Sequence, residues 1–183
     1  MDEVWFSRLA QPKLAAWSAP QEPLRLFEKT LPPEDKTVKA IACYGCYLPQ
    51  IKTMQQGERM WLRFVQGRPT SAYTCAFLEW LTQQVATGGK RVLVLFWDNA
   101  TWHRSRVVQT WIKTHNQQVK DRGGVRLVVY ALPVKSPWLN NIEPKWRHGK
   151  RAVVEPQRVL PAEELAQRLC AYYGCEYLTH LTP

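Results

Sequence analysis

Three acidic residues occupy positions where an α/β protein can hold metal ions. Asp98 directly follows the most apolar stretch of the chain, residues 91–97, and acids at strand ends in open α/β sheets face the ligand-binding crevice. Glu143 follows a proline-broken loop at the start of an expected helix, and Asp2 begins the first expected strand. Carboxylate oxygens are preferred ligands of Mg²⁺ and Mn²⁺, and two such ions can activate a nucleophile and stabilise the leaving oxygen of a phosphodiester.

Each of these acids also has an ordinary structural explanation. Asp98, followed by Asn99, can form a turn and cap a helix. Glu143 in the first turn of a helix can complement the helix dipole, and Asp2 can be a frayed terminal acid. Position alone therefore leaves both explanations open for all three.

The net charge of +10 points to a polyanionic partner, because lysines and arginines that neutralise phosphates release counterions. The charge is uneven, since residues 144–151 (PKWRHGKR) hold five basic side chains immediately after Glu143. A merely soluble basic protein is the alternative, and charge alone does not separate the two.

The composition favours a cytoplasmic protein with no membrane partner. No stretch approaches the ~18 apolar residues of a membrane span, and the acidic N-terminus has no signal-peptide pattern. Five cysteines, an odd number, suit a reducing compartment. Cys43-x-x-Cys46 has the spacing of half a zinc site, but Cys170 and Cys175 are badly spaced for the other half, so structural cysteines are the preferred interpretation.

The pattern of apolar residues predicts one domain, residues 1–183, of strands followed by alternating helices and strands. Strands are expected at 2–6, 37–48, 60–65, 91–97 and 125–132, the last two buried on both faces because their apolar runs are continuous. Helices are expected from Ser71, as the cap, to Gly88, then over 105–120, from Ile142 to at least Lys150, and from about 161. Prolines predict loops at 10–35 and 133–140. The order β–β–β–α–β–α–β–α–α implies a mixed sheet covered by helices.

Two stretches resemble a known family. Residues 96–105 (FWDNATWHRS) contain D-N-A-x-x-H after an expected strand, and residues 132–146 (LPVKSPWLNNIEPKW) contain P-x-x-S-P-x-L-N-x-I-E-x-x-W after the next one. Together they resemble the DDE endonuclease domain of bacterial insertion-sequence transposases in the mariner-like superfamily. The resemblance implies an RNase H-like mixed sheet of about five strands flanked by helices, with the first strand truncated. A junction resolvase or an integrase would share that fold, but the second motif argues against both.

The resemblance also assigns roles around the metal ions. It implies that Asp2, Asp98 and Glu143 form the catalytic triad and hold two Mg²⁺ or Mn²⁺ ions for DNA-strand cleavage and strand transfer. Glu3 is the rival of Asp2, and since neighbouring strand residues point to opposite faces, only one of them is expected to reach the metals. Accessory polar residues that orient the acids, contact phosphate or shape the loop before Glu143 are Asn99, His103, Ser136, Asn140 and Asn141, with helix capping as the alternative for Asn99.

The expected partner is double-stranded DNA, at the element ends and at the target, with a homodimer as a further expectation. Trp138 is expected to stack on a base or ribose, or else to be buried under its loop. Phosphate contacts, or alternatively a solvated helix face, are expected at Lys145, Arg147, Lys150 and Arg151. Such transposases carry helix-turn-helix modules, expected here on a separate chain, and associate with the nucleoid when active. The competing expectation is an inactive fragment that only binds DNA or a partner subunit.

Overall fold

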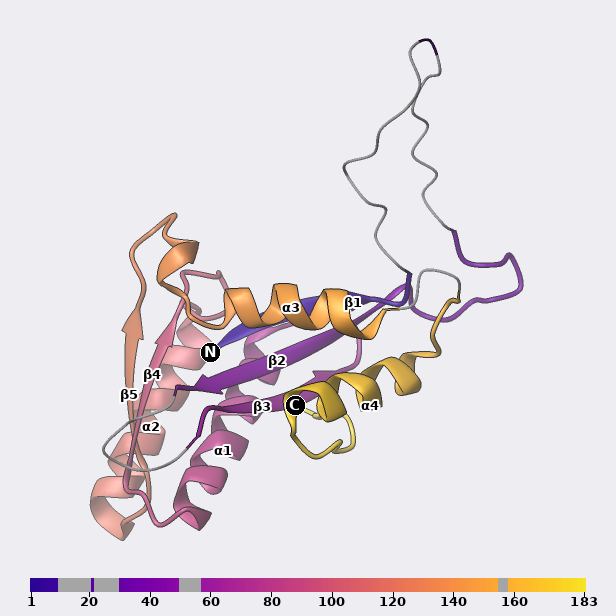
Figure 1. Cartoon of the computed structure of the whole chain (residues 1–183). Helices are drawn as coiled ribbons and strands as arrows, with labels where there is room; N and C mark the ends of the chain where they lie inside the picture. The colour runs from indigo at the N-terminus through magenta and orange to yellow at the C-terminus, as the bar shows by residue number, and fades with distance from the viewer. Residues whose placement is uncertain (10–20, 22–29, 50–56, 155–157) are drawn as a thin grey trace.

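The computed structural model describes residues 1–9, 21, 30–49, 57–154 and 158–183. Most of the expected loop at 10–35 lies outside these residues. The described part follows the expected order (Figure 1): β1 (Asp2–Ser7), β2 (Ala40–Leu48), β3 (Arg59–Val65), α1 (Ser71–Thr87), β4 (Val92–Trp97), α2 (Arg106–Arg122), β5 (Arg126–Ala131), the 3₁₀ helix η2 (Pro137–Leu139), α3 (Glu143–Val153) and α4 (Ala162–Tyr173). None of the helices in the described ranges is long and apolar enough to cross a bilayer.

The five strands form two hydrogen-bonded sheets. β1, β2 and β3 make an antiparallel sheet in that order, whereas β4 and β5 pair in parallel. The two sheets meet where the amino group of Met1 donates a hydrogen bond of 2.8 Å to the carbonyl oxygen of Phe96. The expectation of a single mixed sheet was therefore wrong for the described strands, which form an antiparallel and a parallel sheet that this bond links at the start of β1.

Helices cover both faces of the antiparallel sheet because its side chains alternate between two cores. On one face, Tyr44 of β2 packs with Phe77 of α1 and Val108 of α2. On the other face, Cys43 packs with residues of α3 and α4, and Figure 1 shows α3 lying along β1. β1 follows the same alternation, so Asp2 faces the layer of α3 and α4, and its neighbour Glu3 faces Trp102 and His103 in the turn before α2.

Side-chain caps fix where the helices that border the site begin. Ser105 caps α2 by accepting the backbone N–H of Val108, as its residue type predicts. The expected cap of α1 was off by one residue, because Thr70 accepts the backbone N–H of Tyr73 and Ser71 is already helical. Both residue types cap helices, so composition does not distinguish neighbouring candidates.

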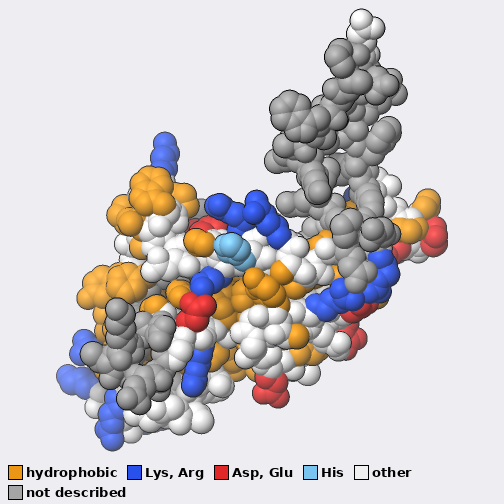
Figure 2. Space-filling model, in the orientation of Figure 1, with side chains coloured by type: hydrophobic (Ala, Val, Ile, Leu, Met, Phe, Trp, Pro, Cys, Tyr) orange, Lys and Arg blue, Asp and Glu red, His pale blue; other side chains and the backbone are white. Residues whose placement is uncertain are grey.

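The expectation that β4 and β5 are buried on both faces was wrong. In β4, Leu93, Leu95 and Trp97 are buried against α1 and α2, but Val92, Val94 and Phe96 on the other face are about half exposed. Tyr130 of β5 is similarly exposed and stacks on Phe96 with ring centroids 5.4 Å apart. Figure 2 shows hydrophobic side chains gathered over these strands. α3 and α4 pack on β1–β3 and leave this face bare, which a continuous apolar run does not reveal.

The cysteines are all free thiols. Cys43 and Cys46 belong to different cores, since residues three apart in a strand point to opposite faces. Their spacing therefore does not make half a zinc site in this fold, and the structural interpretation describes them.

Candidate active site

Asp2 is buried at the start of β1, beneath α3. Its Oδ2 accepts a hydrogen bond of 3.1 Å from the indole Nε1 of Trp146. Burial raises the pKa of Asp2 to about 7, and the negative charges of Glu3, Glu143 and, more weakly, Asp98 add to the rise. Asp2 therefore interacts electrostatically with both other acids expected from the sequence.

A glycine makes room for the indole that binds Asp2. Gly45 lies opposite Asp2 in the β1–β2 register, and a Cβ atom added to it would lie 2.1 Å from the Trp146 ring. That distance is far inside van der Waals contact, so a larger residue would displace the ring or the strand. Gly45 thus determines how closely α3 approaches the sheet beside Asp2.

Glu143 is the first residue of α3, as predicted. The buried side of this helix carries Ile142 at its N-cap, Trp146, Gly149 and Val153, and this spacing of three to four residues turns Glu143 outward. The backbone N–H of Glu143 donates to the Asn140 carbonyl at 3.0 Å, which ties the helix start to the preceding loop. Its carboxylate is exposed.

Asp98 follows β4 directly, and its side chain is half exposed. Its Oδ1 accepts two hydrogen bonds of 3.0 Å, from the backbone N–H of Ala100 and from Nδ1 of His103. The bond to His103 holds the pKa of Asp98 below its ordinary value, with a smaller contribution from Ala100. Asp98 is thus an ionised carboxylate at neutral pH.

His103 is fully buried and joins Asp98 to Glu3. Its Nε2 lies 2.8 Å from Oε1 of Glu3, and its ring stacks on Trp97 at a centroid distance of 4.6 Å. Burial lowers the pKa of His103, but the hydrogen bonds to Asp98 and Glu3 outweigh it and raise the pKa to about 9. A buried ring with both nitrogens engaged has no access to a phosphate, so the expected direct phosphate contact does not fit this geometry.

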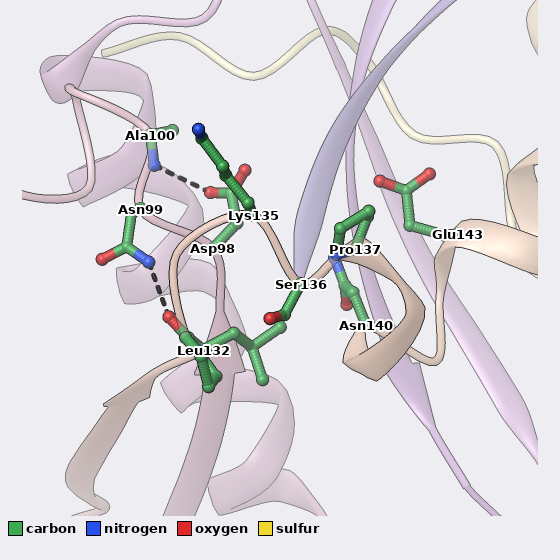
Figure 3. Close-up of a pocket in the computed structure, with 10 residues that line it drawn as sticks. Asp98, Asn99, Ala100, Leu132, Lys135, Ser136, Pro137, Asn140 and Glu143 are labelled. Atoms are coloured by element: carbon green, nitrogen blue, oxygen red, sulfur yellow. Dashed lines mark hydrogen bonds between the residues drawn. The ribbon is translucent and has the colours of Figure 1, made fainter.

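Two cavities meet at Glu143. The first, of about 290 Å³, lies between the end of β4 and the loop before α3, and Figure 3 shows Asp98 and Glu143 on opposite sides of it. The second, of about 390 Å³, runs between β1 and α3 and is lined by Glu3, Trp5, Glu143, Arg147 and Lys150, among others. A chain-like ligand that passes Glu143 can therefore occupy space on either side of it.

Comparison with known proteins identifies the family. Residues 33–166 match the family model of DDE superfamily endonucleases, which is more than half of the chain. The chain belongs to the DDE superfamily of endonucleases. Asp98 and Glu143 lie within the matched residues, whereas Asp2 precedes them. A search of curated protein sequences gives no significant match.

The DDE domain is similar in fold to solved structures of the Mos1 transposase. These include a paired-end complex with the left transposon end (TM-score 0.63, 15% identity), a strand transfer complex (0.60, 17%) and a mariner paired-end complex with Mn (0.61, 16%). They cover 94–96% of this chain but only 46–47% of the Mos1 chains. The DDE domain thus spans less than half the length of these transposase chains.

The accessory residues of the DDE domain hold its strand ends and loop together. Asn99 donates from Nδ2 to the carbonyl oxygen of Leu132 at 2.6 Å and so joins the ends of β4 and β5. Asn140 is buried next to Glu143. Asn99 thus neither caps α2, which is the role of Ser105, nor bonds Asp98.

The side chains expected to contact DNA differ in their exposure and in whether they already form an ion pair. Arg147 and Arg151 are exposed, Lys150 is half-buried, and Figure 2 shows Lys and Arg side chains gathered over α3. Lys145 instead forms an ion pair of 2.8 Å with Glu58 and lies over the ring of Tyr47. Trp138 is 75% exposed, which excludes burial under its loop.

Sequence reasoning missed Trp5, the half-exposed aromatic residue that lines the second cavity. A large apolar side chain on the polar-facing register of an alternating strand is the only signal that marks it. Reasoning from the sequence also missed that Trp146, matched as part of the second motif, donates to Asp2.

The three acids expected to hold metal ions do not form a finished metal site in the structure described. Among residues 1–9, 21, 30–49, 57–154 and 158–183, no group of three or more His, Cys, Asp or Glu side chains is arranged to hold an ion. The donor set nevertheless fits Mg²⁺ or Mn²⁺, because these acids supply oxygen ligands and their mutual repulsion is visible in the raised pKa of Asp2. A divalent cation would relieve that repulsion.

Proposed function

We propose that this chain is the catalytic domain of a DNA transposase, which cleaves DNA strands and transfers them to a new site in a metal-dependent reaction. The observation that carries the proposal is the placement of three acids from distant parts of the chain: Asp98 and Glu143 line one cavity, and Asp2 is bonded to the helix that begins at Glu143. Burial raises the pKa of Asp2 to about 7, and the negative charges of Glu3, of Glu143 and, more weakly, of Asp98 add to the rise. Membership of the DDE endonuclease family supports the same chemistry.

Asp2, Asp98 and Glu143 would hold two Mg²⁺ or Mn²⁺ ions in this proposal. When bound, two divalent cations would supply activation of the attacking oxygen and stabilisation of the leaving oxygen of the phosphodiester. The chain's own contribution is to orient the carboxylates. Trp146 holds one oxygen of Asp2, and Ala100 with His103 holds Oδ1 of Asp98, which leaves Oδ2 of Asp98 without a bonded donor among the described residues.

The substrate in this proposal is double-stranded DNA held against the acids by α3. Arg147, Lys150 and Arg151 would contact phosphates, and their position after Glu143 on one helix would set the backbone's path past the acids. The exposed rings of Trp5 and Trp138 would stack on bases or riboses at either side. The Mos1 transposase is solved in a paired-end complex with its left transposon end, which supports DNA ends as the substrate. The further partners in this proposal are a second copy of this chain and a helix-turn-helix region on a separate chain.

A plasmid-nicking assay tests the proposal. Supercoiled plasmid is incubated with the protein and Mn²⁺, and relaxed circles are quantified on a gel. We expect nicking that EDTA abolishes and that Asp98→Asn or Glu143→Gln reduces to background, without loss of folding. The matched control is Asp121→Asn, an exposed acid on α2, which should nick like the wild type. Unchanged nicking in either active-site variant would refute the assignment.

The second candidate function is a domain that only binds DNA or a partner subunit. The observation in its favour is that the acids in the described residues are not arranged to hold an ion. The basic residues of α3 do not depend on that arrangement. A folded sample that shifts labelled DNA in a gel but nicks no plasmid with Mn²⁺ would favour this second function.

A further inference from the structure

A hydrogen-bonded series of three side chains, Glu3–His103–Asp98, links β1 to the acid at the end of β4, and its first two members are buried. His103 has no exposed surface, and the Glu3 side chain is only 3% exposed. The His103 ring is clamped between these carboxylates while its face stacks on Trp97, with the two ring planes only 5° apart. Ring position and rotation are therefore both fixed by contacts.

Both carboxylate oxygens of Glu3 accept hydrogen bonds from neighbouring side chains. Oε1 bonds Nε2 of His103 at 2.8 Å, and Oε2 accepts the indole N–H of Trp102 at 3.0 Å. Glu3 thus bonds His103 with one oxygen and Trp102 with the other. This separates it from its neighbour Asp2, which faces the opposite side of β1 towards α3.

At the Asp98 end of this hydrogen-bonded series, the two carboxylate oxygens have different numbers of hydrogen-bond partners. Oδ1 accepts from His103 and from the backbone of Ala100, both at 3.0 Å. No donor from the described residues is bonded to Oδ2, and Asp98 lines the first cavity. Two donors on one oxygen set the rotation of the carboxylate, which directs the second oxygen to a ligand.

We propose that Glu3 and His103 are positioning residues, which hold Asp98 in the orientation that binds a divalent cation. The inference rests on the proposed function of the site and extends it to two residues that touch neither metal nor DNA. A single strand then sets two of the three acids, because β1 carries Asp2 itself and, through Glu3 and His103, orients Asp98. Removing a hydrogen-bond partner of a metal ligand typically lowers metal affinity by about 10–100-fold.

Two substitutions at one position separate positioning from mere packing. In His103→Asn the amide nitrogen takes the place of Nδ1 and can still donate to Asp98, whereas in His103→Gln it takes the place of Nε2 and reaches Glu3 instead. Both variants lose the ring stacked on Trp97, so both lose stability. We expect Mn²⁺ affinity, measured by electron paramagnetic resonance of free Mn²⁺, to fall only a few-fold in His103→Asn and roughly 10–100-fold in His103→Gln.

The chain contains a matched control histidine. His115 of α2 stacks on Trp111 at 5.0 Å and 9°, and its Nε2 bonds the backbone carbonyl of Val125 at 2.9 Å, away from any acid of the site. His115→Gln should bind Mn²⁺ like the wild type. Equal Mn²⁺ affinity of His103→Asn and His103→Gln, whether intact or equally reduced, would overturn the proposal and leave His103 a packing residue.

A measurement on the wild type covers the case in which neither variant folds. Titration with Mg²⁺ should shift the ring Nδ1 resonance of His103 in a nitrogen-detected NMR spectrum, and leave that of His115 unchanged. No shift at saturating Mg²⁺ would overturn the positioning role. A different result would show that the proposed function itself is wrong: Mn²⁺ would bind neither the wild type nor Asp98→Asn, or would bind both equally. The positioning role would then be wrong as well.

Discussion

Trp146 and Asp2 are joined by a hydrogen bond from the indole Nε1 to Oδ2, 3.1 Å long, although 144 positions separate them in the chain. Both residues are almost fully buried, and the indole packs edge-on against Phe6 and Tyr173. This bond connects the first acid of the site to the helix that carries the third. It gives the carboxylate a fixed orientation in surroundings that disfavour its charge.

Trp146→Phe tests that connection. Phenylalanine keeps most of the packing but has no N–H, so Asp2 loses its donor and the carboxylate is free to rotate. We expect Mn²⁺ affinity to fall by roughly 10–100-fold while the fold is retained. Isothermal titration calorimetry with Mn²⁺ measures the affinity. Trp80→Phe, which truncates an indole of the opposite core, is the control, and an equal loss there would count against a specific role for Trp146.

Gly45→Ala tests the close approach of α3 to β2. The added methyl would lie 2.1 Å from the Trp146 ring, so the ring or the strand must move. We expect unfolding in urea to show a loss of about 1–3 kcal/mol, as overpacking typically costs. Gly57→Ala is the matched control, because a Cβ atom there meets nothing within 4 Å. Combining Gly45→Ala with Trp146→Phe should cost less than the sum of the two single losses, and strict additivity would contradict a direct clash.

In the absence of metal, Asp2→Asn should be more stable than the wild type, and the difference in free energy of unfolding should grow as pH rises. The folded pKa of Asp2 is raised to about 7, so folding favours its protonated form. That contribution to stability is complete below pH 4, is lost as pH rises from 4 to 7, and stays lost above 7. In EDTA at pH 8 we therefore expect Asp2→Asn to exceed the wild type by roughly 2–4 kcal/mol, with little difference at pH 4.

Chemical denaturation at several pH values measures this difference. Asp121→Asn, an exposed acid on α2, should differ from the wild type by little at any pH. If Asp2→Asn is less stable than the wild type at pH 8 in EDTA, the carboxylate is not strained by its neighbours as described. Saturating Mn²⁺ should reverse the order, because the ion binds only the folded wild type tightly.

Neutralising Arg147 and Lys150 together should weaken DNA binding and its dependence on salt. Each DNA phosphate that the protein no longer neutralises lowers the slope of log affinity against log salt by about 1. Fluorescence anisotropy with a labelled duplex at several KCl concentrations should show a slope smaller by about 2 for the double alanine variant. Lys145→Ala should leave the slope nearly unchanged, since Glu58 already neutralises that side chain. If Lys145→Ala lowers the slope as much per removed charge as the double variant does, the helix acts on DNA only through its net charge.

The sequence predicted the order of elements and the placement of Asp98 and Glu143, because these depend on local patterns. Apolar runs, caps and the two motifs place Asp98 after a strand and Glu143 at a helix start, and the structure confirms both placements. Whether these acids hold metal ions stays a prediction. The bare face of β4 and β5 was not predictable, since a continuous apolar run looks the same whether one face or two are covered.

The environment of the acids was also beyond sequence reasoning. Alternation in β1 predicts that Asp2 and Glu3 face opposite sides, but not that Trp146 lies on one side and His103 on the other. These partners are 144 and 100 positions away, and pair identity at such separation depends on how helices dock. Likewise, four basic residues near Glu143 look equivalent in the sequence, and only the ion pair with Glu58 sets Lys145 apart.

The residues of the candidate site are far apart in the sequence, and this determines when the site can form during translation. Asp98 and His103 emerge from the ribosome together with β4, and the neighbouring α2 and β5 complete a locally connected unit. Asp2 emerges first but acquires its indole donor only after residue 146 has been translated, and long-range contacts of this kind form late. A nascent chain, or one that a stop codon ends before α3, therefore lacks Glu143 and leaves Asp2 without its indole donor.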